Sequence, residues 1–135
     1  MFHPWGALRG LAHVIIIWAR PAPGVPAATD GERRIWIDPR MGQRERRCAL
    51  SHELVHLEAG HRGCQPGGVE AWVRGEAARR LIDLDRLAST LLWSQDLREV
   101  ADELWVTELV LADRMAALSP TEHHYLEVLW AAAQG

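Results

Sequence analysis

The N-terminal part of the chain alternates between short apolar runs and turn-forming residues. The segment 13–18 (HVIIIW) is rich in β-branched side chains and predicts a buried strand. Ile35 and Ile37 alternate with Arg34 and Trp36, which predicts a second strand over 34–38, and Asp30-Gly31 before it favours a two-residue hairpin turn. Together with a short helix or turn over 3–12, these patterns predict a small sheet of two or three strands.

From residue 43 onward, the apolar period becomes that of helices. Residues 43–61 contain neither glycine nor proline before Gly60 and predict a helix that ends there. Residues 69–82 predict a second helix with an apolar side. Capping residues predict four further helices, at 84–93 (Asp83), 97–105 (Asp96 with Glu99), 108–117 (Thr107) and 120–133 (Ser119-Pro120 with Glu122). The sequence therefore predicts an α+β fold, with a small N-terminal sheet packed on the first long helix and a helical C-terminal part.

The amino-acid composition excludes several types of catalytic chemistry. All 15 basic residues of this 135-residue chain are arginines. The absence of lysine excludes Schiff-base chemistry, Ser–Lys dyads and a Walker-type phosphate loop. The net charge of −3 conceals an uneven split, because residues 1–80 hold twelve arginines against eight acidic residues and residues 81–135 hold three against ten. The longest compact apolar run near the N-terminus, 14–18, is too short for a membrane span or a signal peptide, which predicts a cytoplasmic protein with no membrane partner.

The strongest chemical motif is HELVH at residues 52–56. Two histidines four positions apart lie on one side of a helix, so that His52 and His56 can bind the same ion. Zinc prefers such nitrogen ligands, and a catalytic zinc site keeps one position for water. Glu53 lies beside the ligands and can act as the general base that activates this water.

A third protein ligand is needed, and the spacing leaves two candidates. The metzincin pattern requires glycine at 59 and histidine at 62, where this chain has Ala59 and Arg62. The alternative is a glutamate from the following helix, either Glu70 or Glu76. These two differ by about 120° around a helix and cannot both face the metal. Spacing alone does not choose between them.

The segment RRCALSHELVHLEAGHRGC, followed by E-x-x-V-x-x-E-A-A-R-R-L-I, resembles the ImmA/IrrE family of zinc metallopeptidases, in its compact actinobacterial and actinophage form. The resemblance extends over most of the chain, including the HPW opening, the T-D-G turn before I-W-I-D, and the final helices. It implies a minimal zincin-like fold with Glu70 as the third, gluzincin-like ligand, because this glutamate precedes the Ala77-Ala78 pair. Glu76 is the reserve candidate. The chain departs from the family pattern at Val73, where a small residue is usual, and at Arg74, where Asn or Asp is usual.

The resemblance also implies a function. Family members resemble switches that cut a helix-turn-helix transcriptional repressor of a mobile element or of a stress response. We therefore expect a zinc-dependent endopeptidase acting on a partner protein, in a single domain 1–135. Residues 1–82 are expected to form the catalytic core and 83–135 a helical cap. An extended substrate is expected to add as a strand along 34–38 or 13–18.

Two other classes of function remain as alternatives. A non-catalytic interaction module would keep the fold and the metal without cleaving a partner. A DNA-binding regulator would use 97–115, whose apolar pattern fits a helix-turn-helix. However, Trp105 stands where this turn usually has glycine, and the acidic composition of the C-terminal part opposes phosphate contacts. Oligomeric state does not follow from the sequence.

Three smaller groups of residues have a structural and a functional interpretation. Cys48 and Cys64 are expected to be small buried thiols, with redox sensing or metal binding as the alternative. A basic cluster before the motif is expected to be a solvated face or a contact for an acidic partner surface: Arg44, Arg46 and Arg47. A polar group on the last helix offers a donor for the scissile carbonyl if that helix covers the site: His123, His124 and Tyr125.

Overall fold

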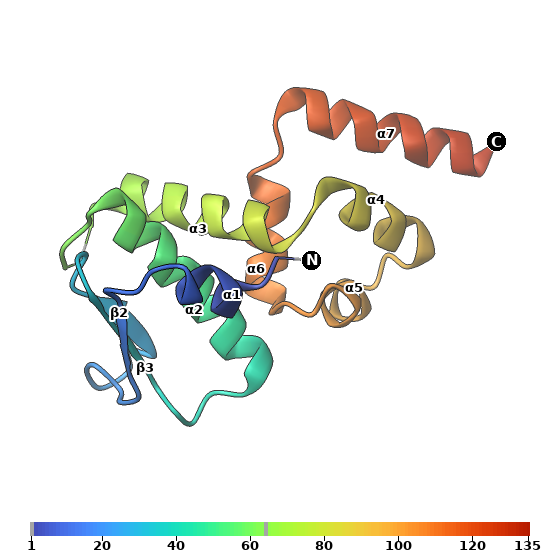
Figure 1. The fold of residues 1–135 in the computed structure, drawn as a ribbon. Helices are drawn as coiled ribbons and strands as arrows, with labels where there is room; N and C mark the ends of the chain where they lie inside the picture. The colour runs from blue at the N-terminus through green and yellow to red at the C-terminus, as the bar shows by residue number, and fades with distance from the viewer. Residues whose placement is uncertain (1, 64) are drawn as a thin grey trace.

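A computed structural model describes residues 2–63 and 65–135 and has an α+β architecture (Figure 1). The part of the chain that it describes contains a three-stranded sheet and seven helices. In chain order, the elements are α1 (Pro4–Arg9), β1 (Ile15–Ile17), β2 (Ala27–Thr29), β3 (Arg34–Ile37), α2 (Gln43–Ala59), α3 (Gly67–Leu81), α4 (Leu84–Trp93), α5 (Leu97–Leu104), α6 (Glu108–Ala116) and α7 (Pro120–Gln134). The expected small sheet, followed by helices, is confirmed.

The sheet has the order β1-β3-β2, with β1 parallel and β2 antiparallel to the central strand. Ile35 and Ile37 of β3 are fully buried. The strand expected at 13–18 exists, but its burial was predicted wrongly, because β1 is an edge strand and Ile15 is 46% exposed. The hairpin also differs from the expected two-residue turn. It contains four residues, 30–33, and the Asp30 carboxylate accepts backbone hydrogen bonds across them.

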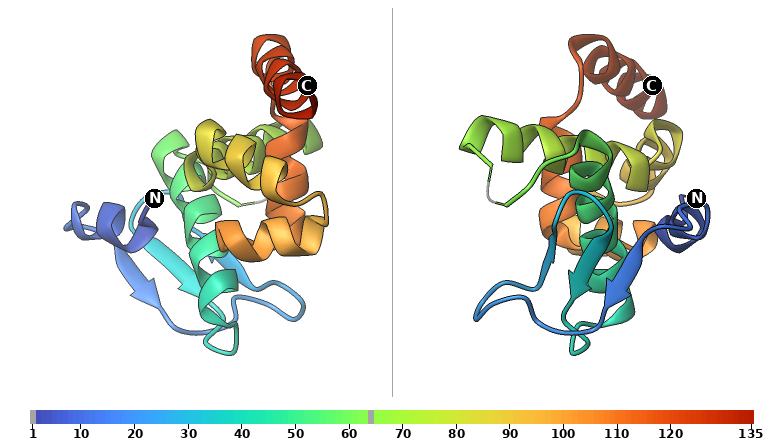
Figure 2. Two further views of the ribbon diagram at one scale, coloured as in Figure 1. Left: turned by 90° about the vertical axis from the view of Figure 1, so that its right-hand side faces the viewer. Right: turned by 60° about the vertical axis from the view of Figure 1, so that its left-hand side comes forward.

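Helix α2 lies between the sheet and the C-terminal helices (Figure 2). One side of it packs on β3 through Leu50 and Leu54. A second side packs on α3 through Val55 and Val73. This three-way packing fixes the position and rotation of α2, which carries the HELVH motif.

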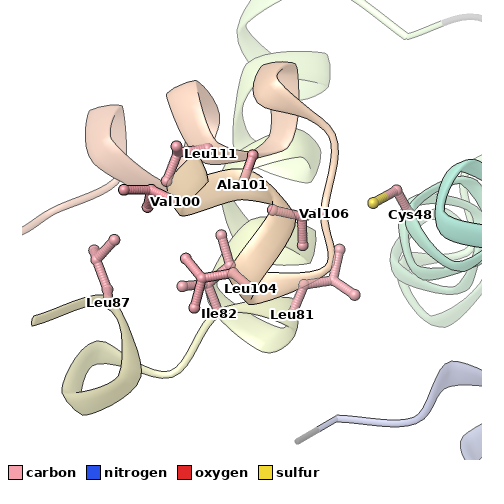
Figure 3. Packing of buried hydrophobic residues seen from close by; sticks show 9 residues of the cluster. All are labelled: Cys48, Leu81, Ile82, Leu87, Val100, Ala101, Leu104, Val106 and Leu111. Atoms are coloured by element: carbon pink, nitrogen blue, oxygen red, sulfur yellow. The ribbon is translucent and has the colours of Figure 1, made fainter. Parts of the chain in front are cut away.

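The largest hydrophobic cluster joins α2 to the helices that follow it. Figure 3 shows Cys48 of α2 pointing toward Val106. The remaining buried members come from α3 to α6: Leu81, Ile82, Leu87, Val100, Ala101, Leu104 and Leu111. Cys48 is thus the buried thiol that the sequence predicts, whereas Cys64 lies outside the described residues.

From α2 onward, the predicted helices agree with the observed ones to within two residues at each end, whereas the helix or turn expected over 3–12 is the shorter helix Pro4–Arg9. Asp96, Thr107 and Ser119 accept backbone hydrogen bonds at the starts of α5, α6 and α7, as predicted. The Ser119–Glu122 capping box is confirmed. The expected box at α5 is incomplete, because the Glu99 carboxylate accepts instead from the Ser94 hydroxyl.

Helix α7 projects from the rest of the structure and packs mainly against α4 (Figures 1 and 2). None of its described side chains is buried. None of the described helices combines the length and apolar character needed to cross a bilayer.

Candidate metal centre

The two histidines of the motif lie on the last turns of α2, near the start of α3. His56 is buried and His52 is half-buried. Glu70, on the first turn of α3, faces both imidazoles: its carboxylate oxygens lie 3.1 Å from Nε2 of His56 and 3.4 Å from Nε2 of His52. The ligand atoms of the three residues all lie within 4.8 Å of one another. They form the one such group within residues 2–63 and 65–135.

The structure separates the two candidate glutamates. Glu76 pairs with Arg80 at 3.5 Å and is absent from the cluster. Glu58, the carboxylate closest to His56 along α2, also pairs with Arg80, at 2.7 Å. Of the two candidate ligands on α3, Glu70 therefore lies beside the histidines and Glu76 does not.

This donor set fits a metal ion of the zinc type. Two imidazole nitrogens and one carboxylate oxygen are a common ligand set of catalytic zinc. Ligands bound at about 2.0–2.1 Å in a tetrahedron are separated by roughly 3.3 Å. The contacts of Glu70 with His52 and His56, at 3.4 and 3.1 Å, match this separation. Three protein ligands would leave a fourth position for a water molecule, as in catalytic zinc sites.

The electrostatics of the cluster favour a bound cation. Glu53 is only 7% exposed, and burial together with the nearby Glu70 raises its pKa to about 7. Burial and the adjacent His56 lower the pKa of His52, although Glu70 opposes this shift. Lowering this pKa favours the neutral imidazole, which is the form that binds metals. A dication placed between Glu70 and the histidines would offset the repulsion between Glu70 and Glu53.

A third histidine, His61, contacts the His56 ring away from Glu70. Nδ1 of His61 lies 3.0 Å from Nδ1 of His56, on the side of that ring opposite Glu70. If Nε2 of His56 held a metal, its ring hydrogen would be on Nδ1, and the acceptor that the described residues place there is Nδ1 of His61. Metal-binding histidines usually donate this second N–H to a fixed partner. His61 is therefore placed to hold the His56 ring in its ligand tautomer.

Two glycines bring His61 to this position. Gly60 ends α2 with a left-handed conformation (φ 72°), which turns the chain so that the His61 N–H donates to the His56 carbonyl at 3.0 Å. Gly31, in the turn between β2 and β3, approaches from the other side. A Cβ atom on Gly31 would lie 2.3 Å from the His61 carbonyl oxygen. The hairpin turn and the end of α2 thus pack against each other only because Gly31 has no side chain.

A cleft of about 620 Å³ runs from the metal cluster between α2, α3 and α6. His52 and Glu53 line its inner end, and most of the remaining wall is apolar. Arg74 also lines it and pairs through Nε with Asp113 of α6 at 3.6 Å. In the sequence, Arg74 is recognisable only as a departure from a family pattern. Its position four residues after Glu70 was the available signal that both side chains share one face of α3.

The sheet edge beside the cleft differs from the prediction. The expected strand at 34–38 cannot accept a substrate strand, because β3 is paired on both sides. The second expected template, the strand within 13–18, is the far edge of the sheet. The strand that lines the cleft and the metal cluster is β2, and its outer edge has no partner strand among the described residues.

Several candidate residues lie away from the metal centre. His123 pairs with Glu127 and lines a separate groove between α4 and α7, and the Tyr125 hydroxyl donates to Asp85. These residues are therefore not carbonyl-binding groups in this arrangement. Burial raises the pKa of the Cys48 thiol, which does not favour a reactive thiolate.

Comparisons with protein-family models, curated protein sequences and solved structures find no match to this chain. The case for its function therefore rests on the geometry of this cluster and cleft.

Proposed function

We propose that this protein is a zinc-dependent endopeptidase that cuts a partner protein, and that His52, His56 and Glu70 hold the zinc ion. The observation that carries the proposal is the cluster of His52, His56 and Glu70, whose ligand atoms all lie within 4.8 Å of one another beside a cleft lined by Glu53. Zinc bound by such a set lowers the pKa of a coordinated water to about 7 and polarises a carbonyl.

The residues around the cluster have separate tasks in this proposal. In the metal-free protein, burial and Glu70 raise the pKa of Glu53 to about 7, and a cation held by Glu70 would lower this pKa and favour the charged form that a general base needs. Glu53 accepts the proton of the attacking water and then donates a proton to the leaving amine. Arg74 lies in the same cleft, where its guanidinium can donate to a substrate carbonyl.

The proposed substrate is an extended segment of protein. The free edge of β2 runs beside the cluster and offers backbone groups with which a peptide can pair. The apolar walls of the cleft suit a bulky hydrophobic side chain next to the cut bond. The resemblance to the ImmA/IrrE family supports a helix-turn-helix repressor as the protein that carries this segment.

Metal analysis and cleavage assays together test the proposal. Protein purified without chelator is expected to contain about one zinc ion per chain. Glu53→Gln should keep the zinc and lose cleavage by about 10²–10⁴-fold, because a general base contributes about that factor. His56→Ala should lose both zinc and cleavage, whereas Glu76→Gln, the matched control on α3, should keep both. Cleavage is measured on a peptide library by mass spectrometry and on a co-expressed repressor from the neighbouring reading frame.

The possible outcomes separate the classes of function. A wild-type protein without zinc would overturn the proposed metal site. A protein that holds zinc but cuts neither the library nor the repressor would favour a non-catalytic interaction module on the same fold. A Glu53→Gln variant that still cuts would exclude Glu53 as the base.

A further inference from the structure

A second hollow lies at the N-terminal end of α2, away from the metal centre. Its volume is about 350 Å³, within the range of roughly 300–1,000 Å³ that is typical of small-ligand sites. It shares no lining residue with the cleft beside Glu53. The wall contains two arginines and two tryptophans and, among the described residues, no acidic side chain: His3, Trp5, Gln43, Arg46, Arg47 and Trp105.

Within residues 2–63 and 65–135, Arg47 is a buried cation without an anionic partner. The residue is 5% exposed, and its guanidinium donates to three backbone carbonyls, at 2.8 Å to Trp105, at 3.3 Å to Phe2 and at 3.5 Å to Leu81. Its Nε is buried and has no hydrogen-bond partner among the described residues. Burial lowers the pKa of Arg47, and the positive charge of Arg86 adds to this effect. The expectation that this basic cluster is a solvated face is therefore wrong for Arg47. A buried charge is normally paired with an opposite charge, whereas Arg47 is held by carbonyl dipoles and by no carboxylate among the described residues.

A second arginine and a helix end add positive potential at the same place. The Arg46 guanidinium donates through Nη2 to the Pro39 carbonyl and lies 5.3 Å from the centre of the Trp18 ring. Its buried Nε has no hydrogen-bond partner in the described part of the chain. Trp18 in turn stacks on Trp5, with ring centres 5.7 Å apart. Gln43 is the first residue of the 17-residue helix α2, whose N-terminal end favours negative charge.

Trp105 lines the hollow and has an unusual backbone conformation. It ends α5 with a left-handed backbone (φ 54°, ψ 49°), and it is the only residue other than glycine with a positive φ in the described chain. Glycine or asparagine normally occupies this position, because a Cβ atom is disfavoured there. The side chain is 42% exposed, so core packing does not account for a tryptophan. Disfavoured backbone conformations are concentrated at binding and catalytic sites.

We propose that this hollow binds a mononucleotide, with the phosphate at Arg46 and Arg47 and the base against the indole rings of Trp5 and Trp105. Guanidinium groups match the geometry of phosphate oxygens, and indole rings stack on any nucleobase. The proposal is independent of the peptidase assignment, because it uses no residue of the metal centre.

Calorimetric titration with AMP, GMP, CMP and UMP tests the site on the full-length protein. At least one of them should bind with one molecule per chain, and its nucleoside and inorganic phosphate alone should each bind at least about tenfold more weakly. Trp105→Gly is the decisive variant. Glycine favours the left-handed conformation, so the variant should unfold at the same or a higher urea concentration, yet bind the nucleotide about tenfold or more weakly.

Arg46→Gln should weaken nucleotide binding about tenfold or more, without the risk to folding that a change at the buried Arg47 carries. Two matched controls keep the residue type but lie outside the hollow: Trp93→Ala on α4 and Arg98→Gln on α5, both exposed. Both should leave binding unchanged. The proposal is overturned if none of the four nucleotides binds below about 1 mM. It is also overturned if phosphate alone binds as tightly as the nucleotide, or if Trp105→Gly and Arg46→Gln bind like the wild type.

Discussion

The two ends of helix α2 carry buried charge of opposite sign. Near its C-terminal end, Glu53 is buried next to Glu70, and the repulsion contributes to its raised pKa. Near its N-terminal end, Arg47 is buried against backbone carbonyls and close to another arginine. Neither Glu53 nor Arg47 is in an ion pair within residues 2–63 and 65–135. One end is thus suited to a cation, and the other to an anion.

Arg114 is a second buried arginine, and in contrast to Arg47 it has a structural role only. This residue is as deeply buried as Arg47, but it lies 3.6 Å from the carboxylate of Glu122, and its Nε donates to the Ile82 carbonyl at 2.9 Å. The chain therefore supplies the counter-charge itself where α6 and α7 meet. Because removing a charge from water is costly unless it is paired, the unpaired charges on α2 point to bound ligands.

The largest effect that tests this contrast is a loss of stability at high pH in the metal-free protein. The pKa of Glu53 is raised from 4.5 to about 7. A raised pKa stabilises the fold fully below about pH 4.5, and this stabilisation is lost as the pH rises through 7. The shift corresponds to about 3 kcal/mol. Urea unfolding of chelator-treated protein at pH 5 and pH 8 should show this loss, and Glu53→Gln should abolish it.

The comparison of the variant with the wild type isolates Glu53. The lowered pKa of His52 acts in the opposite direction below about pH 6.5, but it is common to both proteins. Glu76→Gln provides a glutamate control that is already paired with Arg80. If wild type and Glu53→Gln lose stability equally between pH 5 and pH 8, the carboxylate at this end of α2 is not an uncompensated charge.

The next largest effect concerns His61, which contacts the metal-ligand candidate His56 near the C-terminal end of α2. His61→Phe removes the acceptor for Nδ1 of His56, and zinc affinity should fall about 10–100-fold, or roughly 1.4–2.7 kcal/mol. His61→Asn should retain most of the affinity, because the asparagine oxygen can occupy the place of the lost nitrogen. Competition with a chromophoric chelator measures both affinities. Equal affinities for the two variants would show that His61 does not position His56.

Much of the metal centre could be predicted from the sequence, because it depends on local patterns. The helix with His52 and His56, and its end at Gly60, followed from spacing and from one glycine. The choice of Glu70 over Glu76 needed more than spacing, because it depends on the path of the Pro/Gly-rich turn between α2 and α3. A resemblance favoured Glu70, and the structure places it beside the histidines.

The errors concern burial, which depends on contacts between distant segments. A run of β-branched residues cannot reveal that β1 is an edge strand, because strand order is decided by the rest of the sheet. The arginines before the motif have the composition of a solvated face. Arg47 is buried because Trp105, 58 positions later in the sequence, and Phe2 close over it. No local pattern contains that information.

The smallest expected effect concerns Glu122, whose positively charged partners come from the chain itself. Its contribution to stability depends on pH with the opposite sign to that of Glu53. Hydrogen bonds from Arg79 and from the Ser119 backbone hold the pKa of Glu122 at about 2, below its usual 4.5. A lowered pKa stabilises the fold above about pH 4.5, and this stabilisation is lost as the pH falls through 2. Glu122→Gln should therefore cost about 1 kcal/mol at pH 6 and almost nothing near pH 2. Thermal unfolding at both values measures the difference, with Glu127→Gln on the exposed side of α7 as the control. A cost that is equal at pH 6 and pH 2 would mean that Glu122 acts by packing, and the contrast with Glu53 would then not be one of charge.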